Sequence, residues 1–146
     1  LLENEEALRI AIEALGHLGD KRAVEPLIAA LQNDNIDHRA LVADSLGKLG
    51  DKRAVEPLIA ALQSADTRDR GIVAYSLGEL GDKRAVGPLI AMLLNGSTYR
   101  NRGYAAVALG QLGDMRAVEP LTMALKHPAR WVRQSAATAL NLLSTE

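Results

Sequence analysis

The side chains that usually perform chemistry are not arranged for catalysis in this sequence of 146 residues. The sequence contains no cysteine, which excludes thiolate nucleophiles, thiolate metal ligands and disulfides. Its three histidines, His17, His38 and His127, are too far apart in the predicted helices to converge on one metal ion. No serine has a histidine and an aspartate in the arrangement of a catalytic triad, and no glycine-rich loop follows a strand to hold phosphate. We therefore expect no catalytic residue, no metal and no cofactor, and the sequence favours a protein that is not an enzyme.

Binding chemistry is indicated instead by aromatic and arginine side chains in the second half of the chain. The sequence has three tyrosines, one tryptophan and no phenylalanine. Tyrosine, tryptophan and arginine are the residue types most enriched at the energetic centres of protein interfaces. The candidate partner-binding residues are Arg68, Tyr75, Tyr99, Arg100, Tyr104, Arg130 and Trp131. For Tyr104 and Trp131 the alternative is a structural role, in which the ring packs on a neighbouring helix or covers the end of the array.

A row of charged residues accompanies these aromatic side chains. Its members, one in each repeat of the pattern described below, are Glu6, Asp37, Arg68, Arg100 and Arg130. The row changes from acidic to basic along the chain, and its basic part is suited to attract a partner that has an acidic segment. The alternative is an exposed polar edge, because most surface charges contribute little.

The element that must position these residues is a repeated segment. The sequence LGDKRAVEPLIAALQ at 18–32 recurs unchanged at 49–63, with three changes at 80–94, and with eleven of fifteen letters kept at 112–126. The copies begin at 18, 49, 80 and 112, so they are spaced by 31, 31 and 32 residues. An internal period of this length indicates a repeat array.

Each repeat reads as a pair of helices. In the first repeat Gly19 suits the end of one helix, and Asp20 is placed to cap helix A, predicted at about 22–32. Asn35 is the predicted cap of helix B, at about 36–49. Two such helices cannot bury their apolar faces alone, but stacked copies can. We predict one all-α domain over 1–146, with a half repeat at 1–17 and repeats at 18–48, 49–79, 80–111 and 112–146.

The two helices of a repeat differ in how far they vary. The first two repeats are identical over the fifteen residues of the A segment, and the sixteen residues that follow agree at only six positions. Exposed positions of helix A, such as Glu25 and Glu56, are also kept. We infer that the exposed side of helix B contacts a partner, the alternative being that its surface simply drifts.

Aspartates and arginines recur once in each repeat. The three sets are Asp20, Asp51, Asp82 and Asp114; Arg22, Arg53, Arg84 and Arg116; and Arg39, Arg70, Arg102 and Arg133. One charge in each repeat is the spacing of a structural network rather than of one active site. We predict a ladder of hydrogen bonds between repeats.

The letters LGD-x-RAVEPL, then an arginine, then a helix ending ALG-x-LG resemble the HEAT-like repeat of the phycobilisome-lyase type. The resemblance covers essentially the whole chain. It implies a right-handed α-solenoid with A helices on the convex side and B helices on the concave side. Similar repeats serve as bilin-lyase subunits, scaffolds and artificial binding proteins. HEAT-like di-iron hydroxylases resemble this architecture and use His-Glu pairs, but this sequence contains no His-Glu dipeptide.

Charge and hydropathy narrow the choice of partner. The net charge is −1, which argues against nucleic acid as a partner. The same argument applies to binding of DNA in the way that HEAT-like DNA glycosylases bind it. No apolar run approaches the length of a membrane span and no secretory leader opens the sequence, so we expect a cytoplasmic protein. The half repeat lacks its helix A, and we expect its apolar flank at Leu8, Ile12 and Leu15 to be covered by further residues, by a neighbouring domain or by a second copy of the chain, three alternatives between which the sequence does not choose.

The predicted function is a non-enzymatic scaffold that binds a protein or peptide on the concave face formed by the second helices. The alternative, from the resemblance, is a subunit of a phycobilin lyase-like system that attaches pigments.

Overall fold

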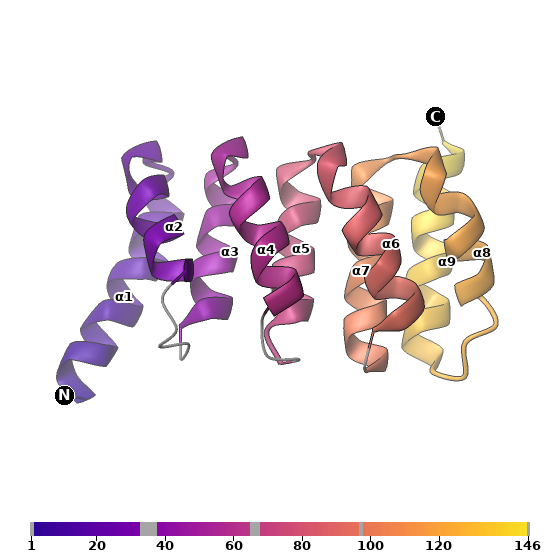
Figure 1. Ribbon diagram of the computed structural model, residues 1–146, viewed down its shortest axis with the longest axis horizontal. Helices are drawn as coiled ribbons and strands as arrows, with labels where there is room; N and C mark the ends of the chain where they lie inside the picture. Colours follow the sequence, from indigo (N-terminus) through magenta and orange to yellow (C-terminus); the bar gives the residue numbers. More distant parts are fainter. Residues whose placement is uncertain (1, 33–37, 65–67, 97, 146) are drawn as a thin grey trace.

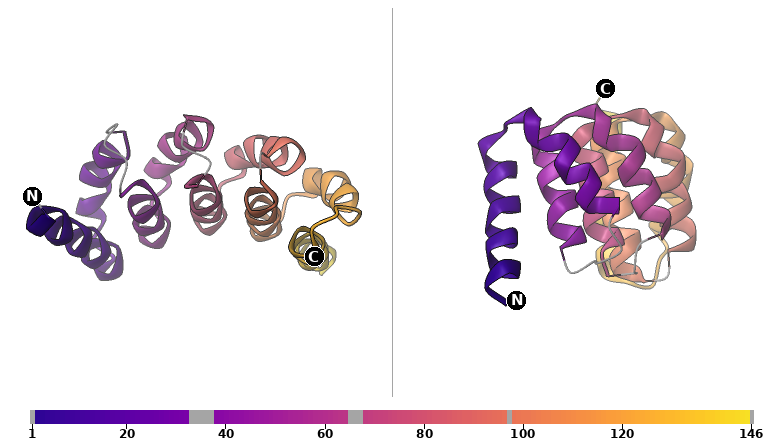
Figure 2. Two further views of the ribbon diagram at one scale, coloured as in Figure 1. Left: turned by 90° about the horizontal axis from the view of Figure 1, so that it is seen from below. Right: turned by 60° about the vertical axis from the view of Figure 1, so that its left-hand side comes forward.

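Two rows of helices build the molecule (Figure 1). The computed structural model describes residues 2–32, 38–64, 68–96 and 98–145. These residues form nine α-helices and four 3₁₀ turns, and no strand occurs among them. The rows follow an arc, so the predicted all-α solenoid is confirmed (Figure 2).

The outer row contains the A helices, and the inner row contains the B helices. The A helices are α2 (Val24–Gln32), α4 (Val55–Ser64), α6 (Val86–Asn95) and α8 (Val118–Ala124). The B helices are α1 (Leu2–Leu18), α3 (Arg39–Leu49), α5 (Arg70–Leu80), α7 (Tyr99–Leu112) and α9 (Arg130–Ser144). The left view of Figure 2 shows that the B helices lie on the concave side of the arc and the A helices on the convex side.

The turn from each B helix to the next A helix has the same construction in every repeat. Gly50 ends α3 with φ 68°, a left-handed conformation that glycine adopts without steric cost. The Asp51 side chain then accepts from the Arg53 backbone N–H at 3.0 Å. The first turn is a 3₁₀ turn, Lys52–Ala54, so α4 begins later than the pattern predicts. We call the four such turns, from Asp20, Asp51, Asp82 and Asp114 onward, the capped edge.

The start of the first complete B helix also differs from its predicted position. Helix α3 begins at Arg39 rather than near residue 36, and His38 at its N-cap makes no side-chain capping bond. The predicted cap Asn35 lies outside the described residues. At the far end α9 begins after Ala129, which likewise offers no side-chain cap.

Small residues set the spacing between neighbouring B helices. A methyl group added at any of four glycines would come within 3.0 Å of a residue on the next B helix. The pairs are Gly16 with Ser45, Gly47 with Ser76, Gly78 with Ala108, and Gly110 with Ala139. These close approaches let the leucines and valines of both rows bury against one another, with Leu46, Leu58, Leu77, Leu89, Leu109 and Leu121 all fully buried.

The predicted ladder between repeats is mostly wrong. Each capped-edge aspartate instead forms an ion pair with the arginine of its own turn. In the second repeat, for example, Asp51 Oδ2 lies 2.9 Å from Arg53 Nη2. Within this pair the arginine holds the pKa of Asp51 at about 2. Arg102 and Arg133 bind carbonyl groups of their own repeats, such as the Gly96 carbonyl 2.9 Å from Arg102 Nε. The aspartates and these arginines can be satisfied inside one repeat because the turn brings their partners within a few residues.

Arg53 and Arg84, within the described part of the chain, do cross between repeats. Arg53 reaches Glu25 at 3.3 Å, and Arg84 reaches Glu56 at 3.4 Å. These contacts give the kept glutamates of the outer row a structural role, so their identity across repeats does not by itself distinguish a scaffold surface from a binding surface. Gly87 occupies the corresponding position opposite Arg116.

Candidate functional site

Three aromatic rings form a continuous row across the C-terminal half of the concave side. Tyr75 of α5 and Tyr104 of α7 meet edge to face, with ring centroids 6.5 Å apart and planes at 79°. Tyr104 and Trp131 of α9 meet in the same way at 5.1 Å and 78°. Such edge-to-face pairs are a favoured arrangement of aromatic rings. We call Tyr75, Tyr104 and Trp131 the aromatic row.

Two of these rings rest on glycines of the preceding B helix. A methyl group added at Gly71 would overlap the ring of Tyr104, and one added at Gly103 would overlap the ring of Trp131. The structural alternative for these two rings therefore has direct support, because each fills the space that a missing side chain leaves. All three rings of the row nevertheless remain partly exposed, so they can pack on their neighbours and still present a surface.

Arg100 joins the aromatic row. Its guanidinium carbon lies 5.8 Å from the centroid of the Tyr104 ring, within the range of a cation–π contact. Arg100 and Tyr104 are four residues apart on α7, which places them one helical turn apart on the same side. The structure therefore brings four predicted residues together: Tyr75, Arg100, Tyr104 and Trp131.

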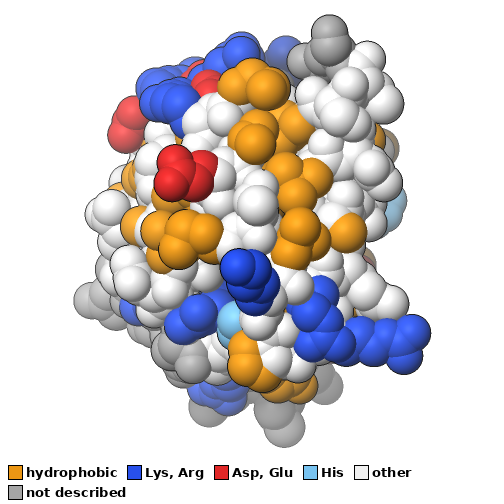
Figure 3. All heavy atoms as spheres, turned by 90° about the vertical axis from the view of Figure 1, so that its right-hand side faces the viewer, with side chains coloured by type: hydrophobic (Ala, Val, Ile, Leu, Met, Phe, Trp, Pro, Cys, Tyr) orange, Lys and Arg blue, Asp and Glu red, His pale blue; other side chains and the backbone are white. Residues whose placement is uncertain are grey.

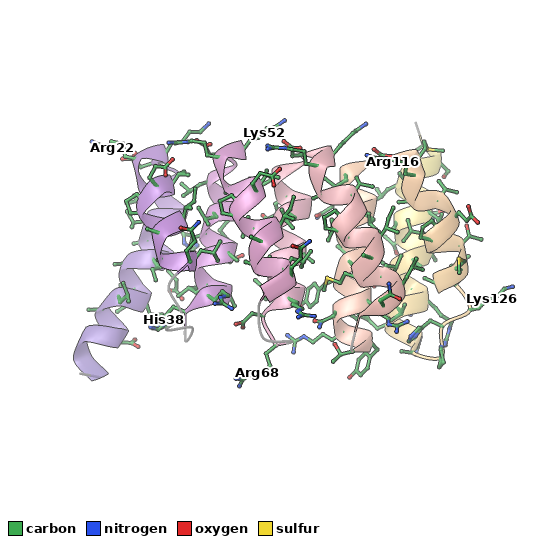
Figure 4. All side chains as sticks on the ribbon, viewed as in Figure 1. Arg22, His38, Lys52, Arg68, Arg116 and Lys126 are labelled. Carbon is green, nitrogen blue, oxygen red and sulfur yellow. The ribbon has the colours of Figure 1, made fainter. Side chains whose placement is uncertain are left out.

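The other three predicted residues lie outside this cluster. Tyr99 is 62% exposed at the first position of α7. Arg68 lies on the edge formed by the loops between A and B helices, two residues before α5 (Figure 4). Arg130 begins α9 and is exposed. The last member of the predicted charged row was wrong. Arg133 corresponds to Arg102 in the repeat before, so the residue that corresponds to Arg100 is Trp131 rather than Arg130.

The N-terminal half of the concave side has a different chemistry. A shallow depression there is lined by Arg9, Glu13, His38, Ala40, Leu41, Asp44 and Ile72. Its charges are paired along the helices, Arg9 with Glu6 at 2.6 Å and with Glu13 at 2.9 Å, and Lys48 with Asp44 at 2.7 Å.

Sequence reasoning did not identify this depression. The spacing of four residues between Glu13 and Arg9, and between Lys48 and Asp44, was a signal in the sequence for the pairs themselves. Burial, with the Asp44 carboxylate as a smaller cause, raises the pKa of Glu79 above its usual value. Asp37 of the predicted charged row lies outside the described residues.

The concave side offers binding chemistry. Within the described parts of the chain, no group of three or more His, Asp or Glu side chains is placed to hold a metal ion. Two of the three histidines contact the backbone instead: His17 Nδ1 lies 2.8 Å from the Glu13 carbonyl, and His127 Nδ1 accepts from the Ala129 N–H at 3.0 Å. None of the helices in the described residues is long and apolar enough to cross a bilayer.

Comparison with known proteins establishes the family. A profile of HEAT repeats matches residues 1–78 and 55–141, and the chain therefore belongs to the HEAT repeat family. No curated protein sequence matches the chain.

Two solved structures share the fold. One is a chain from the complex of CpcE and CpcF of phycocyanin lyase from Nostoc sp. PCC7120, with 31% identity and a TM-score of 0.81. The other is human deoxyhypusine hydroxylase in complex with glycerol, with 28% identity and a TM-score of 0.74. The match covers 94% of this chain and 59% of the first, and 87% of this chain and 45% of the second. Together with the family match, the first structure confirms the predicted resemblance to HEAT-like repeats of the phycobilisome-lyase type.

Proposed function

We propose that this protein is a scaffold that binds a protein or peptide partner on its concave side and performs no catalysis itself. The observation that carries the proposal is the aromatic row with Arg100, a continuous and partly exposed surface built from three successive B helices. Aromatic rings held in place by their neighbours lose little conformational entropy on binding, which makes them effective anchors. Membership of a repeat family whose arrays form extended concave surfaces adds support.

The chemistry of the surface defines the partner. The rings of Tyr75, Tyr104 and Trp131 suit an apolar or aromatic side chain, and Arg100 beside them suits a carboxylate. Arg68 and Arg130 lie at the N-terminal ends of α5 and α9, as Arg100 does on α7, and they add positive charge at this end of the B helices. The partner segment is therefore an extended or helical peptide in which an apolar residue is close to an acidic one.

The test is a selection of peptides from a displayed random library on the intact protein. Selected peptides are labelled, and their affinity is measured by fluorescence anisotropy against wild type and against a triple variant with Tyr75→Ala, Tyr99→Ala and Arg100→Ala. Tyr104 and Trp131 are kept in this variant because they fill the space over Gly71 and Gly103. We expect an affinity loss of about tenfold or more, the usual result of removing hot-spot side chains.

A matched triple variant on the convex side controls for general effects. Lys52→Ala, Met115→Ala and Glu119→Ala remove three exposed side chains of the outer row and the capped edge. This control is expected to bind like wild type, and circular dichroism checks that both variants keep their helices. If the two triple variants lose the same affinity for the selected peptides, or if both bind the peptides as wild type does, the assignment of the binding surface to the concave side is refuted.

A second candidate function is favoured by one observation, the 31% identity to a chain of the phycocyanin lyase complex. In that case the concave side would hold a bilin over the tyrosines, with Arg68 and Arg100 paired to its propionates. Titration of free bilin followed by visible absorbance tests this directly. A spectral change that is lost on Arg68→Ala with Arg100→Ala supports the alternative, and an unchanged spectrum in wild type removes it.

Self-association is the remaining proposal about partners. On α3, Ser45 donates to the Ile12 carbonyl of α1 and is buried, as are Val42 and Leu49, whereas the residues at the corresponding positions of α1, Ala11, Ala14 and Leu18, are exposed. Leu18 is 75% exposed. The predicted flank is thus partly wrong, since Ile12 is buried within the chain. Sedimentation of wild type and Leu18→Glu tests the proposal, with a concentration-dependent dimer that the variant abolishes as the supporting result.

A further inference from the structure

Two grooves of the same construction open between successive A helices. The first lies between α4 and α6 and is lined by Leu62, Gln63, Arg70, Pro88, Ala91, Met92, Asn95, Gly96 and Asn101. The second lies between α6 and α8 and is lined by Leu93, Leu94, Arg102, Met123, Ala124, Lys126, His127 and Val132. Most of their lining positions correspond across one repeat, so Arg70 matches Arg102, and Asn101 matches Val132. The first groove therefore serves as an internal reference for the second.

The second groove is more basic than the first. His127 of the second groove stands at the position of Asn95 in the first groove. Lys126 stands at the position that Leu94 has in the third repeat. Gln63 is replaced by Leu94. Arg102, Lys126 and His127 thus lie together, and no acidic residue is among the lining side chains. Figure 3 shows basic side chains gathered near a histidine on the lower part of the C-terminal end face, with apolar side chains beside them.

The early end of α8 places these basic residues. Because Pro128 disfavours a helical conformation at His127, the last turn tightens into bonds between residues three apart. Lys126 N donates to the Met123 carbonyl at 3.2 Å, and His127 N donates to the Ala124 carbonyl at 3.1 Å. Lys126 consequently emerges at the end of α8 on the loop edge, as Figure 4 shows.

Two of the three basic side chains of the second groove, Arg102 and His127, are oriented by hydrogen bonds to the backbone. Arg102 Nε donates to the Gly96 carbonyl at 2.9 Å, and Arg133 Nη1 donates to the His127 carbonyl at 2.8 Å. The His127 ring accepts from the Ala129 N–H through Nδ1 at 3.0 Å, so in the neutral ring the proton is on Nε2. Nε2 is then a hydrogen-bond donor. Groups held in this way lose little freedom when a ligand binds.

We propose that this groove binds the C-terminal carboxylate of a peptide whose last side chain is apolar. The carboxylate complements Arg102, Lys126 and His127, which supply several donors and positive charge and no competing acid. The last side chain lies against Leu94 and Met123, which are exposed beside them. Capture of a terminal carboxylate by a group of donors is a recurring mode of peptide recognition.

The site lies on the A-helix side of the molecule, whereas the aromatic row lies on the B helices. The two sites are therefore separable, and the groove does not depend on the proposed concave function. Variants of the aromatic row are expected to leave carboxylate binding unchanged, so each proposal can fail without the other.

The experiment is an NMR titration of the intact ¹⁵N-labelled protein with acetyl-Gly-Gly-Leu. The free acid is compared with the C-terminal amide of the same peptide. We expect shifts centred on the amides of Leu94, Ala124, His127 and Val132, and an affinity for the amide lower by about tenfold or more, because the charge-assisted bonds are lost. A third peptide, acetyl-Gly-Asp-Gly-amide, asks whether a side-chain carboxylate suffices.

Variants decide whether the lining residues are responsible. The double variant Lys126→Gln with His127→Gln is expected to lower the affinity for the free-acid peptide by about tenfold. Lys83→Gln, a matched loss of charge on the capped edge, is expected to leave that affinity unchanged. Shifts spread over the protein, equal affinity for acid and amide, or an unaffected double variant would each overturn the proposal. Equal binding of the aspartate peptide would overturn the assignment to a chain terminus.

Discussion

The outer row and the concave row of this solenoid repeat in different ways. Along the outer row and its capped edge the copies share both sequence and contacts, and in each an aspartate side chain accepts from an arginine amide at 2.9–3.0 Å. Along the concave row the copies share the small residues that set the helix spacing, while the exposed side chains differ from helix to helix. A buried position such as Ala54 is alanine in every repeat, whereas the exposed position of Glu25, whose contact is made in the first two repeats, is Gly87 in the third.

The largest expected effect comes from filling a junction of the concave row. At Gly110 an added methyl group would lie 2.8 Å from the Ala139 backbone, so α9 must move. We expect Gly110→Val to lower the free energy of unfolding by about 3 kcal/mol, the upper range for overpacking. Urea denaturation measures this.

Gly87→Val is the matched control in the outer row, because a Cβ added there meets no atom of a neighbouring helix within 4 Å. Its effect is expected to be a few tenths of a kcal/mol, about the difference in helix propensity. Similar losses in both variants would mean that the junction glycines do not set the helix spacing.

A smaller effect is expected where a glycine supports a ring. Gly103→Ala would displace the indole of Trp131, which is partly exposed and can swing outward rather than push α9 away. We expect a loss of about 1–2 kcal/mol, since the broken ring contacts outweigh the gain in helix propensity. The chain has one tryptophan, so a red shift of its fluorescence reports the displacement without interference.

The control is Gly87→Ala, which should leave the fluorescence unchanged. An unshifted spectrum in Gly103→Ala would show that Trp131 does not rest on this glycine in solution. Peptides selected on wild type should also bind Gly103→Ala less tightly, because the aromatic row is then broken at Tyr104.

Most of the fold could be read from the sequence, because its signal is repeated four times. Glycine after each B helix, aspartate as the cap and apolar residues at helical spacing all point to the same stacked pairs. The boundaries were less accurate: the 3₁₀ turn before α4 delays its start, and the pattern of apolar residues cannot distinguish a first 3₁₀ turn from a first α-helical turn.

The helices that carry the candidate site could be predicted from the sequence, but the contacts between its side chains could not. Assigning Tyr75, Tyr104 and Trp131 to the B helices follows from the register. Their meeting does not, because it depends on Gly71 and Gly103 leaving room for rings from a neighbouring helix. The basic groove near His127 was missed because its residues are close only through the stacking of α6 on α8 and the early end of α8.

The capped edge gives a prediction about pH. Arg53 holds the pKa of Asp51 at about 2, below its ordinary value of 3.8. A carboxyl group with a lowered pKa stabilises the fold above its unfolded pKa, and that contribution is lost as the pH falls from about 4 to 2. Asp20, Asp82 and Asp114 behave alike, so wild type should lose stability across this window.

Asp51→Asn isolates the charge, because asparagine can still accept from the Arg53 amide as a cap. The variant is expected to be less stable than wild type at pH 7 and to lose less stability between pH 4 and 2. Thermal unfolding across this range measures both. Parallel pH profiles for wild type and variant would contradict the assignment of the acid-labile contribution to this pair.

The smallest expected effect completes the contacts between repeats in the outer row. Arg53 and Arg84 each reach a glutamate of the preceding repeat, but Arg116 faces Gly87 at the corresponding position. Gly87→Glu should therefore stabilise the protein by about 0.5–1 kcal/mol, partly through helix propensity and partly through an exposed ion pair. Gly87→Gln provides the propensity without the charge.

The difference between these two variants at low salt is the contribution of the ion pair, and it should disappear at about 1 M salt because exposed charges are then screened. A glutamate that stabilises no more than glutamine at any salt concentration would mean that the exposed contacts of Glu25 and Glu56 do not hold the repeats together. Their identity across the first two repeats would then need another explanation, and the contrast between the outer and concave rows would again favour a binding surface on the B helices.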